Sequence, residues 1–429
     1  MPTTRSLKSA FRHSIRLGTG RAYLLAQAHP DVDFSAYIIE ASLTNFSYDG
    51  QAESSRADYL YGLYCLSGQQ ARIRRAVLKA LATEQDDTWT LTQLFALTLR
   101  FAQAGDAEAR LALYRRFLVR PVGGADWAGA DEIMTLDGLD GFHYIVRKVG
   151  RKLARHPDGW EDAMLINLFQ EKYPALDAWA ELRQLAPHDA DVRRYLLNVE
   201  ATMAERASYQ RPAEVWDADL LGVLEGARPA YLRSLLRRRK LKPSEINQLA
   251  ARLLVARRPP LLENLLLVFS RIPFPLPYAS ILALARQRSR GSRIREFALD
   301  ALALLSAPEI REFALVQLRQ TSRPASYTSL LINNYQPGDA ALLTDIVGCT
   351  HEEHAIEQLA ISYSDVYKNN KTPECAAPLL ALYGKMTCSM HRHTVVQLLL
   401  ENHVLPAWLN EELPFDSYAE TRTLDQPQP

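Results

Sequence analysis

Cysteine and histidine gather towards the C-terminal end of the chain, where their types and spacing could bind a metal ion. Three of the four cysteines and five of the ten histidines lie between residues 349 and 403. Zinc accepts thiolate and imidazole ligands in such mixtures. The pattern lies in Cys349-Thr-His351-Glu-Glu-His354 and Cys388-Ser-Met-His391-Arg-His393, and the candidate ligands are His351, His354, Cys388 and His391.

The spacing of these residues argues against a zinc site of a common type. The patterns C-x-H-x₂-H and C-x₂-H-x-H match no common zinc module, and the helical protease motif needs its histidines four residues apart rather than three. Thr350-His-Glu-Glu353 is also a sequence that starts helices, with a capping threonine and acids in the first turn. We therefore predict neither a metal nor another cofactor.

Residues that could catalyse a reaction form no recognisable motif. Paired carboxylates such as Asp189 with Asp191 are supplied by any helical surface. The sequence contains no G-x-x-x-x-G-K-[ST], no G-x-G-x-x-G and no G-x-S-x-G, so the common nucleotide-binding and hydrolase fingerprints are missing. We predict that the protein is not an enzyme.

Basic residues concentrate in one segment, between Arg228 and Arg295, which we call the basic segment. It holds sixteen lysines and arginines against two acids, although the net charge of the whole chain is only +1. Such a segment would attract an acidic protein partner or the phosphates of a nucleic acid. Cations that offset helix dipoles or pair with acids nearby would give the same pattern. The candidate binding residues are Arg233, Arg237, Arg238, Arg239 and Lys240 in one run, and Arg286, Arg288, Arg290 and Arg293 in another.

Tyrosine is frequent in the first third of the chain. Tyr59, Tyr61 and Tyr64 stand close together, and Tyr61 and Tyr64 share one face of a predicted helix over residues 55–66. Tyrosine suits surfaces that bind peptides, because it is apolar and yet accepts hydrogen bonds. Tyrosines packed between helices would give the same sequence, so this aromatic surface is a candidate with a structural alternative.

Helices must position all of these residues. Nearly every segment has apolar residues at i, i+3, i+4 and i+7, and strand-like alternation is hard to find. The predicted helices include residues 89–104, 138–154, 351–368 and 390–402. Short gaps separate most of them, which indicates antiparallel neighbours rather than a bundle with long crossovers.

An internal repeat ties this helicity to a repeating unit. Ile294-Arg-Glu-Phe-Ala-Leu299 recurs as Ile310-Arg-Glu-Phe-Ala-Leu315, sixteen residues later. Looser copies are Ile73-Arg-Arg-Ala-Val-Leu78, Ala109-Arg-Leu-Ala-Leu-Tyr114 and Val192-Arg-Arg-Tyr-Leu-Leu197. The pattern resembles the HEAT repeat, and within that group the HEAT-like repeats of the phycobilisome-lyase type. This resemblance implies an all-α fold, an α-solenoid wound as a right-handed superhelix of antiparallel helix pairs, whose surface binds other proteins.

One further stretch keeps an enzymatic alternative open. Trp160-Glu-Asp162 places an aromatic ring beside acids and is similar to the HEAT-like DNA glycosylases, which hold a tryptophan and an aspartate on their concave face. That resemblance implies a base-modifying enzyme. A metal-dependent enzyme using the cysteines and histidines is the other form of this alternative.

The chain divides into four predicted parts. Residues 1–54 are capping helices, 55–348 the repeat array, 349–412 C-terminal capping repeats, and 413–429 a disordered tail. Within the array, residues 120–137, including Trp127, are predicted to be an insertion loop of the kind that borders a binding face.

The first thirty residues are basic, with no acid before Asp31, and have an apolar face formed by Leu7, Phe11 and Ile15. They are either a targeting or membrane-surface segment or the first helix of the array.

The composition is that of a globular protein without a membrane-spanning helix. The 429 residues are 48% hydrophobic and 23% charged, as in ordinary globular proteins. The four cysteines are too scattered for a disulfide framework, and no apolar stretch approaches the ~18–20 residues of a membrane helix. We predict a cytoplasmic, non-enzymatic scaffold for protein–protein interaction. The alternative is a nucleic-acid-binding protein that uses the basic segment.

Overall fold

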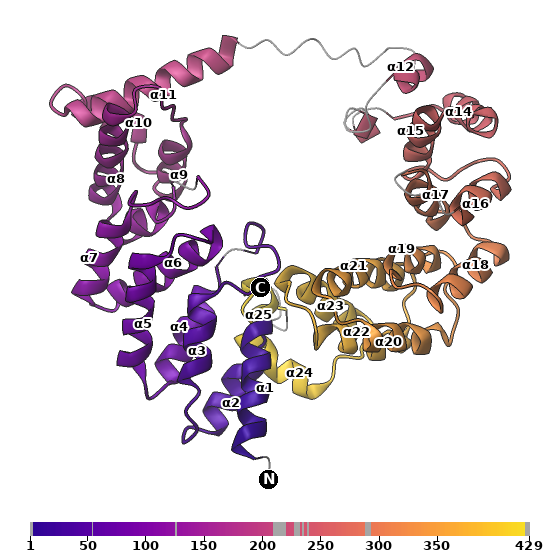
Figure 1. The fold of residues 1–429 in the computed structure, drawn as a ribbon, viewed down its shortest axis with the longest axis horizontal. Helices are drawn as coiled ribbons and strands as arrows, with labels where there is room; N and C mark the ends of the chain where they lie inside the picture. The colour runs from indigo at the N-terminus through magenta and orange to yellow at the C-terminus, as the bar shows by residue number, and fades with distance from the viewer. Residues whose placement is uncertain are drawn as a thin grey trace. The chain divides into compact units, whose positions relative to one another are not determined.

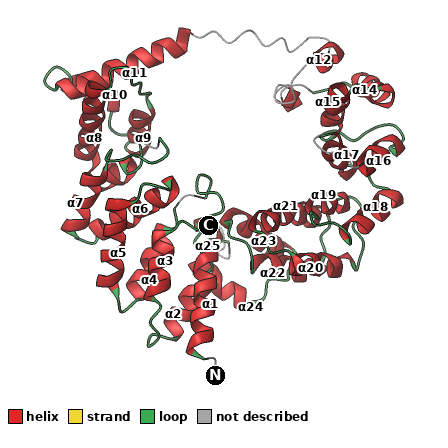
Figure 2. Cartoon of the chain, viewed as in Figure 1, coloured by secondary structure: helices red, strands yellow, loops and turns green. Residues whose placement is uncertain are grey.

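The computed structural model describes residues 3–53, 55–124, 127–208, 220–226, 232–233, 236–237, 240–287 and 293–424. Helices, turns and loops make up these residues, and no strand occurs among them (Figure 2). The predicted all-α class is therefore confirmed. In the same ranges no helix combines the length and the apolar character needed to cross a membrane.

Two compact units make up the chain (Figure 1). Unit 1 comprises residues 1–212 and 411–429, and unit 2 comprises residues 213–410. The elements of unit 1 are α1 (Thr4–Leu17), α2 (Arg21–Ala28), α3 (Ser35–Leu43), α4 (Ala57–Leu66), α5 (Gln70–Thr83), α6 (Thr88–Gln103), α7 (Ala107–Arg116), α8 (Ala130–Arg155), α9 (Met164–Lys172), α10 (Ala178–Leu185), α11 (Ala190–Ser208), η3 (Leu413–Phe415) and α25 (Ala419–Arg422).

Unit 2 is built in the same way from shorter helices. Its elements are α12 (Leu220–Gly226), α14 (Pro243–Val255), α15 (Pro259–Phe269), α16 (Ala279–Arg286), α17 (Ile294–Ala303), α18 (Pro308–Leu318), α19 (Ala325–Thr328), η1 (Ser329–Leu331), α20 (Asp339–Cys349), α21 (Glu353–Asn369), η2 (Pro373–Cys375), α22 (Ala376–Tyr383), α23 (Ser389–Glu401) and α24 (Ala407–Glu412), of which residues up to Asn410 belong here.

Helices in both units pack against the next helix and also against the next but one. In unit 1, α3 contacts α5, α4 contacts α6 and α6 contacts α8. In unit 2, α15 contacts α17, α20 contacts α22 and α21 contacts α23. Each helix therefore buries its apolar stripe against several neighbours, as successive helix pairs in a stack do.

The repeated hexapeptide lies on two consecutive helices, α17 and α18. Phe297 and Ala298 are buried in the first copy, and Phe313 and Ala314, their equivalents, are buried in the second. The repeat therefore places the same apolar face towards the interior twice.

The arginine of the repeat pattern has a structural role in three copies. In each case its guanidinium binds an aspartate of a later helix, at its start in two copies and beside the kink at Gly138 of α8 in the third. Asp106 caps α7 and Asp339 is the first residue of α20. A charge-assisted pair at such a position holds one helix against the beginning of another. The pairs are Arg74 with Asp106 (Nη2–Oδ1 2.8 Å), Arg110 with Asp137 (2.6 Å) and Arg311 with Asp339 (2.5 Å).

The segment after residue 412 differs from the predicted disordered tail. Residues 413–424 form η3 and α25 and belong to unit 1, where Leu413, Asp416 and Thr421 are buried. The Ser417 amide donates a hydrogen bond to the Gly18 carbonyl at 2.9 Å, at the end of α1. Sequence periodicity misses this attachment because the elements are too short to show it. Residues 425–429 lie outside the described residues.

The basic N-terminal segment is part of the core of unit 1. Leu7, Phe11 and Ile15 of α1 are buried, and the Phe11 ring stacks on Phe34 with centroids 4.2 Å apart. The apolar face of this segment is therefore packed inside unit 1.

Candidate functional site

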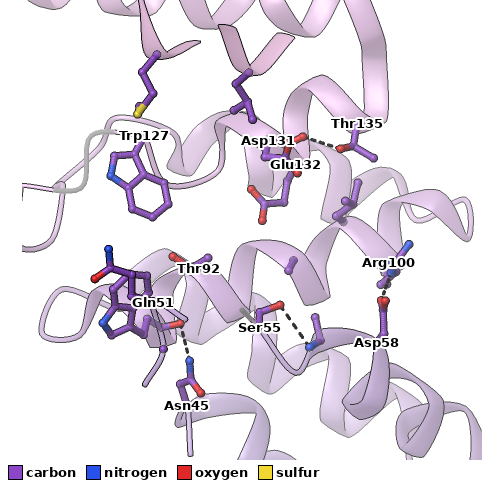
Figure 3. Close-up of a pocket in the computed structure, with 17 residues that line it drawn as sticks. Asn45, Gln51, Ser55, Asp58, Thr92, Arg100, Trp127, Asp131, Glu132 and Thr135 are labelled. Carbon is purple, nitrogen blue, oxygen red and sulfur yellow. Dashed lines mark hydrogen bonds and ion pairs between the residues drawn. The ribbon is translucent and has the colours of Figure 1, made fainter. Parts of the chain in front are cut away.

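A cavity of about 740 Å³ lies within unit 1, between α4, α6, α8, α9 and the loop that precedes α4 (Figure 3). The residues that α6 contributes recur every three or four positions and so lie on one face of that helix. The lining residues are Trp89, Thr92, Ala96, Leu99 and Arg100 of α6; Asp131, Glu132 and Thr135 of α8; Met164 and Leu168 of α9; Ala57 and Asp58 of α4; and Asn45, Gly50, Gln51, Ser55 and Trp127 of loops.

Two tryptophans form an aromatic wall on one side of this cavity. The ring centroids of Trp89 and Trp127 are 6.4 Å apart, and the rings are tilted by 51°. Trp127 is 38% exposed and Met164 is 45% exposed. Large apolar side chains that stay open to solvent around a cavity are a common mark of a binding site.

Glu132 places a carboxylate in the same cavity. Its side chain points into the cavity (Figure 3), yet the residue is only 8% exposed. The pKa of Glu132 is raised to about 7, chiefly by burial; a hydrogen bond from its own backbone amide lowers this pKa, Asp131 contributes to the rise and Lys172 opposes it. No other residue in the described ranges forms an ion pair or hydrogen bond with this carboxylate.

The other charges of the cavity are already matched. Arg100 binds Asp58 at 2.5 Å, and Lys172, from α9, binds Asp131 at 2.7 Å. When Glu132 is ionised, its charge therefore has no ion-pair partner of its own among the described residues. A buried carboxylate without a partner costs free energy, so a cation that enters the cavity would be stabilised by it.

The predicted insertion loop covers the edge of this site, whereas Glu132 was not predicted as a site residue. The predicted insertion loop 120–137 contains Trp127, Asp131, Glu132 and Thr135, but α8 already starts at Ala130. The helix was missed because Gly138, with φ of 54°, interrupts its regular geometry. The sequence does contain a signal for this site: Asp131 and Glu132 follow Trp127 by four and five residues. This spacing is about one helical turn.

A second cluster, in unit 2, joins two of the predicted metal ligands to a residue that the sequence did not indicate. Glu357 of α21, Cys388 at the N-cap of α23 and His391 of α23 each offer a ligand atom, and these atoms lie within 4.8 Å of one another. The Nδ1 atom of His391 is 2.8 Å from Oε2 of Glu357. Hydrogen bonds to Cys388 and Glu357 raise the pKa of His391 to about 10.

The other two predicted ligands lie elsewhere. His351 and His354 are exposed at the start of α21, and neither belongs to the cluster. Glu352, rather than the predicted Thr350, caps this helix by accepting hydrogen bonds from the amides of His354 and Ala355. The helix-start interpretation of this stretch therefore agrees with the structure, with a different capping residue.

The basic segment is described only in part. Arg238, Arg239, Arg288 and Arg290 lie outside the described residues. Of the remaining candidates, Arg233 is half-buried, and the exposed ones are Arg237, Lys240, Arg286 and Arg293.

Some cations of the basic segment are engaged within unit 2. Arg252 pairs with Glu225 at 2.9 Å, and the Arg286 guanidinium lies 5.7 Å from the centroid of Phe313. These contacts support the intramolecular interpretation for the residues concerned.

The predicted aromatic surface is reduced to two residues. Tyr59 is only 2% exposed, and its hydroxyl donates a hydrogen bond to the Thr19 carbonyl at 2.9 Å, so it is a core residue. Tyr61 and Tyr64 are half-buried and stack on each other with centroids 5.5 Å apart, beside Phe101. Their shared helix face is as predicted, but much of it serves to pack α4 against α6.

The residues behind the glycosylase resemblance are engaged with their neighbours. Trp160 is 65% exposed, and the Arg206 guanidinium lies 5.5 Å from its ring centroid. Arg206 also pairs with Asp162 at 3.2 Å. Trp160, Asp162 and Arg206 do not line the cavity of unit 1.

Comparison with family models, with curated proteins and with solved structures gives no match to this chain. The resemblance to HEAT-like repeats therefore stays a prediction from the sequence.

Proposed function

We propose that this protein is a HEAT-like solenoid that binds another protein, and that the cavity of unit 1 takes up a lysine or arginine side chain of that partner. The packing of helices on the next but one supports the solenoid arrangement. The arginine–aspartate pairs made by three copies of the repeat pattern support it as well.

The unmatched carboxylate of Glu132 carries the proposal. A cation in the cavity would neutralise this buried charge and lie near the indole rings of Trp89 and Trp127, whose faces attract cations. Cation–aromatic contacts contribute about 0.5–2 kcal/mol, and a desolvated ion pair adds to this. The same group would bind less well if it were neutral, because Glu132 would remain uncompensated.

Charge complementarity and the rim of the cavity favour a protein segment over a small free cation. Trp127 and Met164 are exposed beside Glu132, so the residues flanking the inserted side chain have apolar surface to cover. Aromatic side chains and methionine are typical of the centres of protein interfaces. The expected partner thus presents a basic residue flanked by apolar ones. This surface differs from the basic segment, for which the sequence indicated an acidic partner.

The test uses short peptides and the fluorescence of the cavity tryptophans. Peptides that carry lysine or arginine between apolar residues are titrated against the whole chain, beside the same peptides with norleucine in place of the cation. We expect Glu132→Gln to weaken binding of the cationic peptides by at least ~10-fold, because the ion pair is lost. Binding should also strengthen as the pH rises through about 7, where Glu132 ionises.

The matched control is Glu40→Gln, which removes an unrelated carboxylate of unit 1 that pairs with Arg12 on the surface. It should leave peptide binding unchanged. Equal affinity for the cationic and the norleucine peptides would contradict the proposal, as would undiminished binding by Glu132→Gln. Free lysine or arginine amide that binds as tightly as the peptides would show that the ligand is a small cation and not a protein.

A further inference from the structure

The cluster of Glu357, Cys388 and His391 lies where two helices of unit 2 meet. α21 supplies Glu357, α23 supplies His391, and Cys388 is the N-cap residue of α23; the two helices pack against each other. Glu357 is fully buried, and Cys388 is 3% exposed. Ligands on two packed helices are held more firmly than ligands on loops, which favours binding of an ion.

We propose that these three residues bind one zinc ion through Sγ of Cys388, Nδ1 of His391 and Oε2 of Glu357. Zinc forms bonds of roughly 2.0–2.3 Å to such atoms in tetrahedral geometry, which places ligand atoms roughly 3.4–3.8 Å apart. One ligand atom of each residue already lies within 4.8 Å of those of the other two, and Nδ1 of His391 is 2.8 Å from Oε2 of Glu357. Small side-chain movements are therefore enough to form the site.

The carboxylate of Glu357 is oriented so that one oxygen is available. Its Oε1 accepts hydrogen bonds from the backbone amides of Thr387 and Cys388, both at 2.9 Å. Its Oε2 faces Nδ1 of His391 at 2.8 Å, and zinc would take the place of the proton between these two atoms. Hydrogen bonds that fix a ligand in this way are typical of metal sites and strengthen them.

The histidine side of the cluster offers a route for the ion. The side chain of His391 is 28% exposed, whereas that of Glu357 is 1% exposed. Zinc can therefore enter from this side, where a water molecule would supply the fourth ligand. Binding releases the thiol proton of Cys388 and the proton at Nδ1 of His391 to solvent.

The ligand set selects the type of metal. A thiolate and an imidazole are preferred by zinc and related transition metals, whereas magnesium and calcium prefer oxygen ligands only. The proposal concerns unit 2 and is independent of the cationic-ligand site of unit 1.

The experiment is a zinc titration of the reduced full-length chain in competition with a chromophoric chelator. We expect one zinc per chain in the unsubstituted protein. Cys388→Ser and Glu357→Gln should each weaken binding by at least ~100-fold, because each removes one of three ligands. Both substitutions keep the size of the side chain, and circular dichroism shows whether the helices remain.

Cobalt provides a second readout that depends on the thiolate itself. The cobalt-loaded protein should show a sulfur-to-cobalt charge-transfer band and the visible bands of a tetrahedral site. Cys388→Ser should remove the charge-transfer band. Cys375→Ser, which changes the other buried cysteine, and His354→Asn, which changes a histidine outside the cluster, should retain it.

Three results would overturn the proposal. The first is the absence of stoichiometric zinc binding at micromolar zinc, which would leave the cluster as a hydrogen-bonded helix cap. The second is unchanged affinity in a folded Cys388→Ser variant. The third is loss of the cobalt band in Cys375→Ser or His354→Asn.

Discussion

Two buried glutamates, one in each unit, show how the same side chain can mark different kinds of site. Glu357 in unit 2 is fully buried, and its carboxylate accepts hydrogen bonds from two amides and contacts the imidazole of His391. Glu132 in unit 1 is almost as buried, but among the described residues its carboxylate has no partner from another residue. The first carboxylate is compensated within the fold, and the second is not.

The difference between the two glutamates indicates that Glu357 stabilises the fold and that Glu132 takes part in binding. A buried charge that has partners holds helices together, so its removal leaves the partners unsatisfied. A buried charge without partners destabilises the free protein and is compensated only when a ligand arrives. Substitutions at the two glutamates should therefore change the stability of the protein in opposite directions.

The largest effect is expected at Glu357. Glu357→Ala leaves two backbone amides and the His391 imidazole without their acceptor, and should destabilise unit 2 by about 3–5 kcal/mol. Hydrogen exchange of peptides from α21 and α23 measures this loss locally. The exposed Gln358 of the same helix, α21, is the control, and Gln358→Ala should cost under ~1 kcal/mol. Equal effects of the two substitutions would contradict the contrast.

The opposite sign is expected at Glu132. The folded pKa of Glu132 is raised from 4.5 to about 7, so the folded state holds its proton more tightly than the unfolded state. The contribution of Glu132 to stability therefore falls as the pH rises from 4.5 to 7, and the penalty is complete above 7. Glu132→Gln should remove a penalty of about 3 kcal/mol at pH 8 and have little effect near pH 4.

Urea unfolding followed by tryptophan fluorescence measures this change, because Trp89, Trp127, Trp160 and Trp179 all lie in unit 1. Lower stability of Glu132→Gln at pH 8 would show that the carboxylate has a partner within the fold. In that case Glu132 would give no reason to expect a cationic ligand in the cavity.

A smaller effect is expected at the arginine–aspartate pairs of the repeat. The side chains of Arg74 and Asp106 are 27% and 19% exposed, and Arg74 lowers the pKa of Asp106. Asp106→Asn keeps an oxygen for capping α7 but loses the charge, and should destabilise unit 1 by about 1 kcal/mol. The exposed pair of Arg12 with Glu40 is the control, and Glu40→Gln should cost under ~0.5 kcal/mol. If the two substitutions had equal effects, the arginine–aspartate pairs would no longer support the stacked arrangement.

The smallest effect is expected in the basic segment. Charge reversal at two exposed candidates, Arg237→Glu with Lys240→Glu, should change binding of cationic peptides by less than about twofold, because neither residue lines the cavity. Gel-shift assays with duplex DNA decide the nucleic-acid alternative. Tight binding at moderate salt that the double variant abolishes would favour that alternative over the proposed function.

The repeating helical pattern was readable from local sequence. Phe297 and Phe313 occupy equivalent positions of an identical hexapeptide, and both are buried as the 3.6-residue period requires. The stretch around Trp127 was also recognised as bordering a site, although Gly138 concealed the helix that begins at Ala130. Tyr59 was a surface candidate with packing between helices as the alternative, and its burial agrees with the alternative; spacing alone cannot separate the two.

The sequence by itself thus determined the all-α class, because apolar periodicity is a property of consecutive residues. Only the tertiary structure decided which side chains meet. Glu357 lies far along the chain from Cys388 and His391, and Trp89 is far from Trp127, so no local spacing connects them. It also decided that Glu132 is buried with no partner from another described residue while Glu357 is buried with several, since burial and pairing depend on how separate helices pack.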